Sequence, residues 1–219
     1  MKATLSETIF TAVAAYVRER LASAPGCHDF DHTLRVLHNS LKLHDMEQDG
    51  DSAVIRLAAL LHDIARPEEM QSSGRICHAE AGAQQVDAIL TQCGVTDPEL
   101  IRQVAAAVRR HRYRGQATPE TIEEKIIYDA DKLDSLGCVG IGRAFHFAGR
   151  IGARLHNTAA EAVNGEAYGR EDSAYREYLV KLQGLPEKML TASGRKLAKH
   201  RAERMATFFQ QLEQEINGA

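Results

Sequence analysis

Apolar residues recur along most of this chain at intervals of three and four, which is the spacing of one helix face. The segments 9–21 and 34–41 show this spacing, and a long last helix is expected over about 189–217. No segment shows a persuasive alternation of apolar and polar residues, the pattern that predicts a strand, and we find no internal repeat. The pattern therefore predicts an all-α fold.

Two polar motifs mark expected helix starts. Asp97 precedes Pro98, so we expect Asp97 to cap a helix whose first turn contains the proline. Thr121 and Glu124 have the spacing of a capping box, which predicts a helix that runs through Leu133. Both signals support the helical interpretation.

Two segments rich in polar or small residues are expected to be loops. The first, 66–76, contains Pro67, and the second, 156–175, is rich in Gly and Glu. We leave open whether the second loop closes over a ligand or links two domains. The preferred organisation is one domain over residues 1–219, with a core at about 1–155, the second loop at about 156–175 and C-terminal helices at about 176–217.

The composition limits the function classes. The 219 residues are 44% hydrophobic, which is enough for a sizeable core, and the net charge of −3 gives no general reason to expect nucleic-acid binding. No apolar run approaches the roughly 18–20 residues that span a bilayer, and the amino-terminal segment reads as an amphipathic helix, not a signal peptide. We expect no membrane partner and a cytoplasmic location. The four cysteines form no C-x-x-C pair and are expected to be reduced thiols: Cys27, Cys77, Cys93 and Cys138.

The apolar segment 53–65, expected to be a central helix, ends by carrying His62 and Asp63 into the interior. A buried carboxylate without a partner is costly, so buried charges are normally paired or bound to metal. Asp131 raises the same problem, because it follows Ile127 by four residues on another apolar helix face. Two carboxylates in one core repel each other, and a cation between them removes that repulsion.

Four histidines from four different expected helices are candidates for the same site: His32, His62, His78 and His111. Helices that pack around one core can bring such groups to one point. Two imidazoles with two carboxylates suit an octahedral divalent ion, and the cysteine spacing excludes an all-thiolate structural zinc site. We expect Mn²⁺ first, with Mg²⁺, Co²⁺, Fe²⁺ or Ni²⁺ as alternatives.

The order of His32, the His62-Asp63 doublet and Asp131 resembles the signature of the HD superfamily of metal-dependent phosphohydrolases. The flanking sequences match as well, with HTLRVL at His32, ALLHDIA at the doublet and DADKLDSLG at Asp131. The resemblance covers most of the chain, and LPEKMLTASGRKLAKHRAERM (185–205) is similar to the tail of stand-alone bacterial HD hydrolases of the YedJ/YpgQ type. The motifs are specific as a set, whereas a single His-Asp doublet is a weak signal.

This resemblance implies an HD-domain helical bundle with a C-terminal helical extension, and hydrolysis of phosphate esters or anhydrides by metal-activated water. Cleavage of nucleoside triphosphates to monophosphate and pyrophosphate is the preferred activity, as in the most similar-looking members. The implied metal ligands are His32, His62, Asp63 and Asp131. Catalytic roles are expected for Asp63, His78 and His111, the two histidines acting as second-metal ligands or as hydrogen-bond partners of the phosphate.

Other polar residues near these motifs have expected supporting roles. Three basic side chains are expected to contact substrate: Arg66, Arg110 and Lys132. Asp134, three residues beyond Asp131, could orient a ligand or a water, and His28 is the second such candidate. His28 either shares a helix face with His32 or lies outside a helix that Asp29 caps.

Several alternatives stay open at this point. The segment VRRHRYRG (108–115), which includes Arg114, suits a phosphate-binding rim, a nucleic-acid patch or a solvated helix end. The main alternatives to the preferred activity are a nucleotide phosphatase or phosphodiesterase, and a non-catalytic nucleotide-binding regulatory module. The expected partner is a small phosphate compound, preferably a nucleotide. Nucleic acid is the least expected partner because the chain is acidic overall. We leave open whether the chain forms a homodimer.

Overall fold

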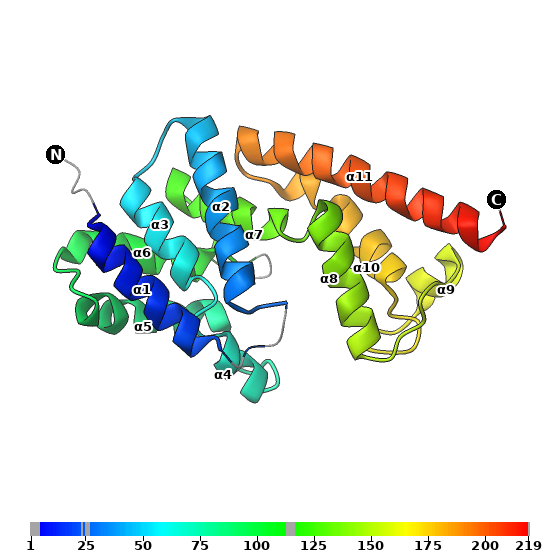
Figure 1. Cartoon of the computed structure of the whole chain (residues 1–219), viewed down its shortest axis with the longest axis horizontal. Helices are drawn as coiled ribbons and strands as arrows, with labels where there is room; N and C mark the ends of the chain where they lie inside the picture. The colour runs from blue at the N-terminus through cyan, green and yellow to red at the C-terminus, as the bar shows by residue number, and fades with distance from the viewer. Residues whose placement is uncertain (1–4, 23, 25–26, 113–116, 219) are drawn as a thin grey trace. The chain divides into compact units, whose positions relative to one another are not determined.

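The computed structural model describes residues 5–22, 24, 27–112 and 117–218, and every regular element in these ranges is helical (Figure 1). The expected all-α fold is confirmed. The elements that begin before residue 132 are α1 (Glu7–Arg20), α2 (Phe30–Glu47), α3 (Ser52–Leu61), α4 (Arg66–Gln71), α5 (His78–Gln92), α6 (Pro98–Arg110) and α7 (Ile122–Leu133). The later elements are α8 (Gly137–Arg150), α9 (Ala159–Asn164), α10 (Ala174–Val180), the 3₁₀ turns η1 (Leu182–Gly184) and η2 (Pro186–Lys188), and α11 (Ala192–Ile216).

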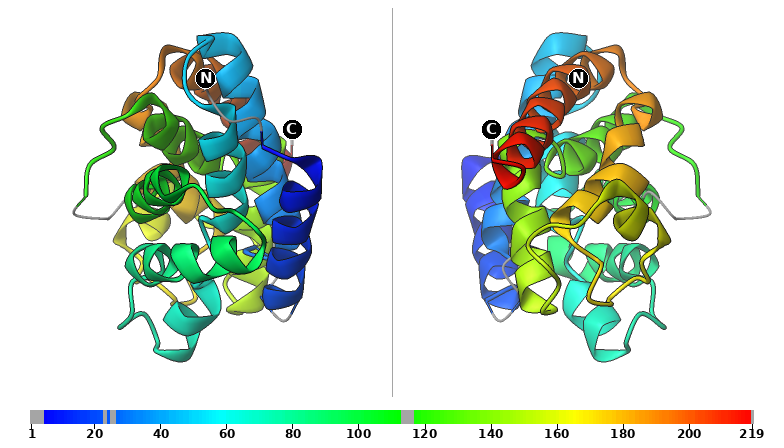
Figure 2. Two further views of the ribbon diagram at one scale, coloured as in Figure 1. Left: turned by 90° about the vertical axis from the view of Figure 1, so that its left-hand side faces the viewer. Right: turned by 90° about the vertical axis from the view of Figure 1, so that its right-hand side faces the viewer.

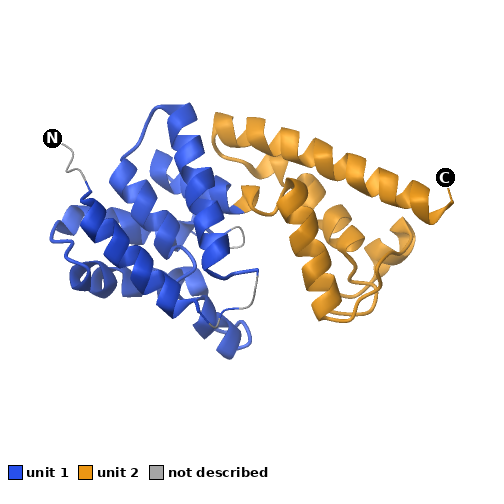
Figure 3. Cartoon of the chain, viewed as in Figure 1, with its two compact units in different colours: residues 1–131 blue, residues 132–219 orange. Residues whose placement is uncertain are grey.

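The chain forms two compact units, residues 1–131 and residues 132–219 (Figure 3). In the first unit, α3 packs against α1, α2 and α6, and α5 packs along α6 (Figure 2). In the second unit, α8 packs against α10 and α11, and α9 packs against α10. The division falls near the end of α7, earlier than the core boundary expected near residue 155. The single-domain interpretation stays a prediction.

The centre of the first unit is α3, whose side chains are all buried except those of Ser52 and Arg56. The helix begins where the Asp51 carboxylate accepts a hydrogen bond from the backbone N–H of Ala53 at 2.8 Å. A helix that is apolar on all sides is stable only inside a protein, so the central position expected for this segment is confirmed. The helix ends at Leu61 with His62 as its C-cap, and the polar site therefore begins where the central helix stops.

Local signals located two helix starts correctly. The Asp97 carboxylate accepts hydrogen bonds from the backbone N–H groups at the start of α6, including that of Glu99 at 2.9 Å. Thr121 and Glu124 exchange the two bonds of a capping box, at 3.3 and 3.4 Å. These caps satisfy N–H groups that have no partner within the helix, which is why they can be recognised from sequence.

Two segments expected to be loops contain short helices. α4 forms within 66–76, with Pro67 in its first turn, where a missing N–H costs no helical hydrogen bond. α9 forms within 156–175, where Thr158 and Glu161 make a capping box. The expectation of uninterrupted loops was therefore wrong for α4 and α9, because neighbouring small and polar residues obscured two helix-start signals.

The second unit has its own apolar centre, in which aromatic rings of α8, α10 and α11 meet. The rings of Tyr178 and Phe209 stack with centroids 4.6 Å apart, and Phe145 packs edge-on against Phe208. α11 begins at Ala192 because the Thr191 hydroxyl caps it, slightly later than the expected start near 189. Within the described ranges, we find no helix with the length and apolar character needed to cross a membrane.

Candidate metal centre

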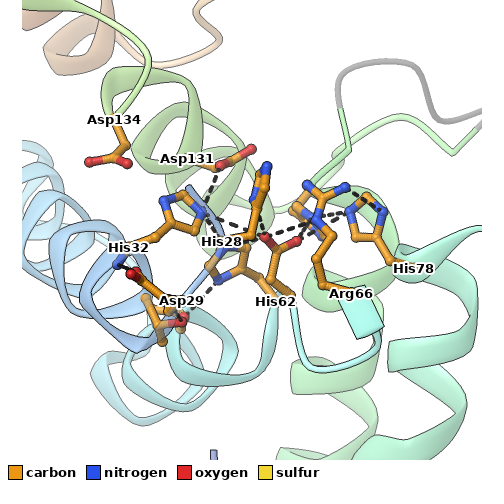
Figure 4. Close-up of polar contacts among 12 residues, drawn as sticks. His28, Asp29, His32, His62, Arg66, His78, Asp131 and Asp134 are labelled. Atoms are coloured by element: carbon orange, nitrogen blue, oxygen red, sulfur yellow. Dashed lines mark hydrogen bonds and ion pairs between the residues drawn. The ribbon is translucent and has the colours of Figure 1, made fainter. Parts of the chain in front are cut away.

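One cluster in the first unit contains six polar residues, four of which are labelled in Figure 4. They are His32 in the first turn of α2, His62 and Asp63 after α3, His78 at the start of α5, His111 at the end of α6, and Asp131 in α7. All are buried except Asp131, whose side chain is 23% exposed. The structure thus brings together the six residues for which the sequence predicted metal or catalytic roles.

One group of facing atoms joins His32, His62, Asp63 and Asp131. The Nδ1 of His62 donates to the backbone carbonyl of Ala59 at 2.8 Å, so the Nε2 of its neutral ring carries a lone pair. This Nε2 lies 3.3 Å from His32 Nε2. His32 Nε2 in turn lies 3.6 Å from Asp63 Oδ2 and 3.6 Å from Asp131 Oδ1. The ligand atoms of His32, His62 and Asp131 lie within 4.8 Å of one another, close enough to hold one cation.

A second group of facing atoms joins Asp63, His78 and His111. The Nδ1 of His111 donates to the carbonyl of Val108 at 2.6 Å, which leaves Nε2 as the acceptor of the neutral ring. The Nε2 atoms of His78 and His111 lie 3.2 Å apart, and Asp63 Oδ1 lies 3.3 and 3.6 Å from them. Among the described residues none donates a hydrogen bond to this buried Oδ1. Three acceptor atoms thus converge, which a cation would satisfy.

Burial controls the protonation of this cluster. It lowers the pKa of His62 to about 4 and that of His78 to about 2, although the negative charge of Asp63 raises both. Burial also raises the pKa of Asp63, but Arg66 and His62 lower it more, so it lies well below the usual value for a carboxyl group. Near neutral pH the two imidazoles are therefore neutral and Asp63 is ionised, which is the state that metal binding requires.

Arg66 and Glu69 lie beside the second group of ligand atoms. The Nε of Arg66 donates to Asp63 Oδ2 at 3.1 Å, and its Nη1 donates to Glu69 Oε2 at 2.6 Å. The same Glu69 oxygen lies 2.8 Å from His78 Nδ1. Sequence reasoning missed Glu69 because 66–76 was interpreted as a loop. A helix beginning at Arg66 would have placed Glu69 three residues on, beside it on one face.

The structure decides between the two alternatives for His28. The Asp29 carboxylate caps α2 by accepting a hydrogen bond from the backbone N–H of His32 at 3.0 Å, and His28 lies before the helix. From there His28 Nδ1 reaches to within 2.9 Å of Asp63 Oδ2. Burial lowers the pKa of His28, although the hydrogen bond to Asp63 raises it. His28 is therefore placed to orient Asp63.

The other residues with expected roles have partners of their own. The Arg110 guanidinium donates to the Glu124 carboxylate at 2.7 Å and lies 3.3 Å from that of Glu120. Lys132 is buried. In the second unit, the Asp134 carboxylate accepts a hydrogen bond from Arg143 at 2.7 Å. Substrate contacts by Arg110 and Lys132, and a supporting role for Asp134, stay predictions.

In the described part of the arginine-rich segment 108–115, residues 108–112, the arginines make ion pairs within the protein. Arg109 donates to Glu80 at 3.1 Å, and Arg112 Nη2 lies 3.2 Å from Glu69 Oε1. Arg114 lies outside the described residues. The pairs that are described favour a solvated helix end with local ion pairs over a nucleic-acid patch.

Comparisons with known proteins agree with this geometry. The profile of the HD domain family matches residues 29–136, which contain all six clustered residues. The chain is 32% identical over 209 residues to the uncharacterized protein YpgQ of Bacillus subtilis, covering 94% of this chain and 93% of that one. The crystal structure of B. subtilis YpgQ in complex with ADP is similar, with a TM-score of 0.74, 28% identity and 96% coverage of both chains. An HD-superfamily hydrolase from Bacillus thuringiensis is also similar, with a TM-score of 0.73, 26% identity and coverage of 96% of this chain and 97% of that one. The His/Asp cluster, the helical fold and these relatives together show that the chain belongs to the HD-domain superfamily of hydrolases.

Proposed function

We propose that this chain is a divalent-metal-dependent hydrolase of nucleotides, which cleaves nucleoside triphosphates to the monophosphate and pyrophosphate. The observation that carries the proposal is the buried set of imidazole nitrogens and carboxylate oxygens that face one another around Asp63. A nucleotide substrate is supported by the ADP complex of the related YpgQ protein.

The donor set fits a divalent metal because it combines imidazole nitrogens with carboxylate oxygens, and a cation among them would offset the buried negative charge of Asp63. A first ion would be held by His32, His62 and Asp131, with Asp63 as a fourth ligand whose Oδ2 lies 3.6 Å from His32 Nε2, and a second ion by Asp63, His78 and His111. Mn²⁺ is the preferred ion, since it accepts both nitrogen and oxygen ligands. A bound divalent ion lowers the pKa of water and offsets negative charge on phosphoryl oxygens.

Arg66 is the chain's own candidate for contacting the substrate. Its Nε holds Asp63 and its Nη1 holds Glu69, and neither of these bonds uses Nη2. Nη2 can therefore donate to a phosphate oxygen while Nε keeps Asp63 in place. Phosphate binding at Arg66 would couple the position of the substrate to the orientation of the central carboxylate.

One member of the cluster, Asp131, and the neighbouring His28 indicate the side from which a substrate approaches. The side chains of His28 and Asp131 are 27% and 23% exposed, whereas those of His32 and His62 are fully buried. A phosphate group entering from solvent would therefore meet the cluster at His28 and Asp131 first. The buried ligands behind them keep bulk water away from the reacting group, which strengthens the electrostatic interactions there.

Product analysis tests the proposal. Metal-stripped protein is reloaded separately with Mn²⁺, Mg²⁺, Co²⁺ or Zn²⁺ and incubated with nucleoside mono-, di- and triphosphates and cyclic nucleotides. We expect pyrophosphate and nucleoside monophosphate to form only with metal, and turnover to be lost in Asp63→Ala. The control variant Asp87→Ala changes an exposed aspartate of α5 and should behave as the wild type.

The products also separate the alternatives. Orthophosphate release would replace the pyrophosphohydrolase assignment with a phosphatase, and opening of a cyclic nucleotide would replace it with a phosphodiesterase. Metal bound in stoichiometric amounts with no turnover of any nucleotide would contradict hydrolysis of nucleotides and favour the regulatory module.

A further inference from the structure

Glu69 is a buried carboxylate that sequence reasoning did not assign to the site. It lies on α4, is 8% exposed, and its Oε2 lies 2.8 Å from His78 Nδ1. A carboxylate can only accept in this bond, so the proton of the neutral His78 ring is on Nδ1. The Nε2 of His78 then carries the lone pair, which faces Asp63 Oδ1 at 3.3 Å.

Two guanidinium groups hold the Glu69 carboxylate in this position. Arg66 Nη1 donates to Oε2 at 2.6 Å, and Arg112 Nη2 lies 3.2 Å from Oε1. Arg66 Nη1 also lies 3.2 Å from His78 Nδ1, but two donors cannot bond to each other, so both donate to the shared Glu69 oxygen. Each carboxylate oxygen therefore has its own cation, which fixes the acceptor that His78 uses.

The position of His78 in its helix explains why a side chain is needed for this purpose. His62 and His111 follow the ends of helices, and their Nδ1 atoms donate to carbonyls three residues earlier, those of Ala59 and Val108. His78 is the first residue of α5, where no preceding helical turn supplies such a carbonyl. Glu69 from α4 supplies the acceptor instead.

We propose that Glu69 is a positioning residue that holds the proton of His78 on Nδ1 and so directs Nε2 toward Asp63 as a metal ligand. This inference deepens the proposed function and rests on it for the role of the metal. Metal-ligating imidazoles are commonly oriented by a carboxylate on their other nitrogen, and loss of that carboxylate weakens metal binding by about 10–100-fold.

Two measurements on the full-length chain test the proposal. In the metal-free protein, long-range ¹H–¹⁵N NMR of the imidazole rings reports which nitrogen of His78 carries the proton. Titration with Mn²⁺ alone, followed by calorimetry, reports the affinity of each bound equivalent. In Glu69→Ala, we expect His78 to lose its preference for the Nδ1 proton, and one Mn²⁺ equivalent to bind about 10–100-fold more weakly.

Two further variants make the result specific. Glu69→Gln keeps an acceptor oxygen for His78 Nδ1 and should therefore keep the preference for the Nδ1 proton that Glu69→Ala loses. This comparison distinguishes a positioning role of Glu69 from a general loss of folding. Glu68→Gln removes the same charge from the neighbouring residue, which pairs with Arg20, and should leave both readouts unchanged.

An unchanged His78 proton position in Glu69→Ala would overturn the proposal, and so would unchanged affinity for every Mn²⁺ equivalent. If the wild type binds Mn²⁺ but hydrolyses no nucleotide, the proposed function fails while the ring protonation and the Mn²⁺ affinities still decide the role of Glu69.

Discussion

The Nε2 atoms of His78 and His111 lie 3.2 Å apart, and in both rings the Nδ1 atom donates its proton to another acceptor. With the proton of each ring on Nδ1, the lone pairs of the two Nε2 atoms face each other beside Asp63 Oδ1, to which no described residue donates. Buried acceptors in this arrangement are unfavourable unless a positive charge lies among them. A divalent ion should consequently stabilise the fold as well as supply chemistry.

Removing the metal should lower the thermal stability of the protein. An ion that binds only the folded state at 100 times its dissociation constant adds about 2.7 kcal/mol to the free energy of unfolding for each site. For a chain of this length, this corresponds to a rise in Tm of roughly 5–10 °C. Calorimetry of the chelator-stripped protein, with and without Mn²⁺, measures the difference.

The variant Asp63→Asn supplies the control for this stabilisation. It removes the charge shared by both groups of ligand atoms while keeping the size of the side chain, so its Tm should respond little to Mn²⁺. An equal rise in Tm for the variant and the wild type would place the binding site elsewhere in the protein.

The stability of the metal-free protein should fall as the pH drops below about 6.5. The pKa of His62 is about 4 and that of His78 about 2 in the folded protein, against 6.5 for an ordinary histidine. Between these values the unfolded chain binds protons that the folded chain excludes, so acid favours unfolding. We expect the free energy of unfolding to fall on the order of 2–5 kcal/mol between pH 6.5 and 4.5, measured by urea denaturation.

A matched pair of histidine variants tests whether buried histidines cause that pH dependence of the free energy of unfolding. His62→Gln should reduce the slope, because the side chain no longer takes up a proton on unfolding. His38→Gln changes an exposed histidine of α2 and should leave the slope as it is. A wild-type curve that is flat from pH 6.5 to 4.5 would contradict burial as the cause of the low pKa values.

Features encoded in a few neighbouring residues could be predicted from this sequence. The cap at Asp97 and the capping box at Thr121 are local, and the apolar run before His62 indicated a buried helix end. The gathering of carboxylates and histidines was predicted from the cost of burying Asp63 without a cation, although Asp131, for which the same burial was expected, is 23% exposed.

Features that depend on packing between helices could not be predicted in this way. Glu69 belongs to a short helix that looked like a loop, and its role depends on α5 beginning beside it. Arg110 donates to Glu124, 14 residues away in sequence, and no periodic pattern selects that carboxylate over a substrate phosphate. Such contacts are decided by the tertiary arrangement.

The side-chain cap of α2, the helix that carries His32 in its first turn, should contribute to the free energy of unfolding. Asp29→Ala removes the acceptor for the backbone N–H of His32, so the free energy of unfolding should fall by about 0.5–2 kcal/mol. Asp31→Ala changes an exposed acid in the same first turn and should cost a few tenths of a kcal/mol, about the size of its interaction with the helix dipole. Chemical denaturation of both variants in the metal-free state measures the difference. If Asp29→Ala and Asp31→Ala lost the same free energy of unfolding, the hydrogen bond of the cap would contribute no more than the interaction of a negative charge with the helix dipole.

Replacement of Asp131 should separate metal binding from folding. Its side chain is partly exposed, and Oδ1 lies 3.6 Å from His32 Nε2, so Asp131→Ala removes one ligand without opening a large cavity. We expect the variant to fold, to lose one Mn²⁺ equivalent, and to lose more kcat/KM on nucleoside triphosphates than the about 10–100-fold that loss of an outer-shell partner costs. Metal analysis of the dialysed protein and steady-state kinetics measure these two effects on one sample. Asp131→Glu provides a graded comparison, because its longer side chain can still bind an ion but would shift the position of that ion. This variant should keep part of the metal content and a smaller part of the activity. Full activity with unchanged metal content in Asp131→Ala would exclude this carboxylate as a ligand.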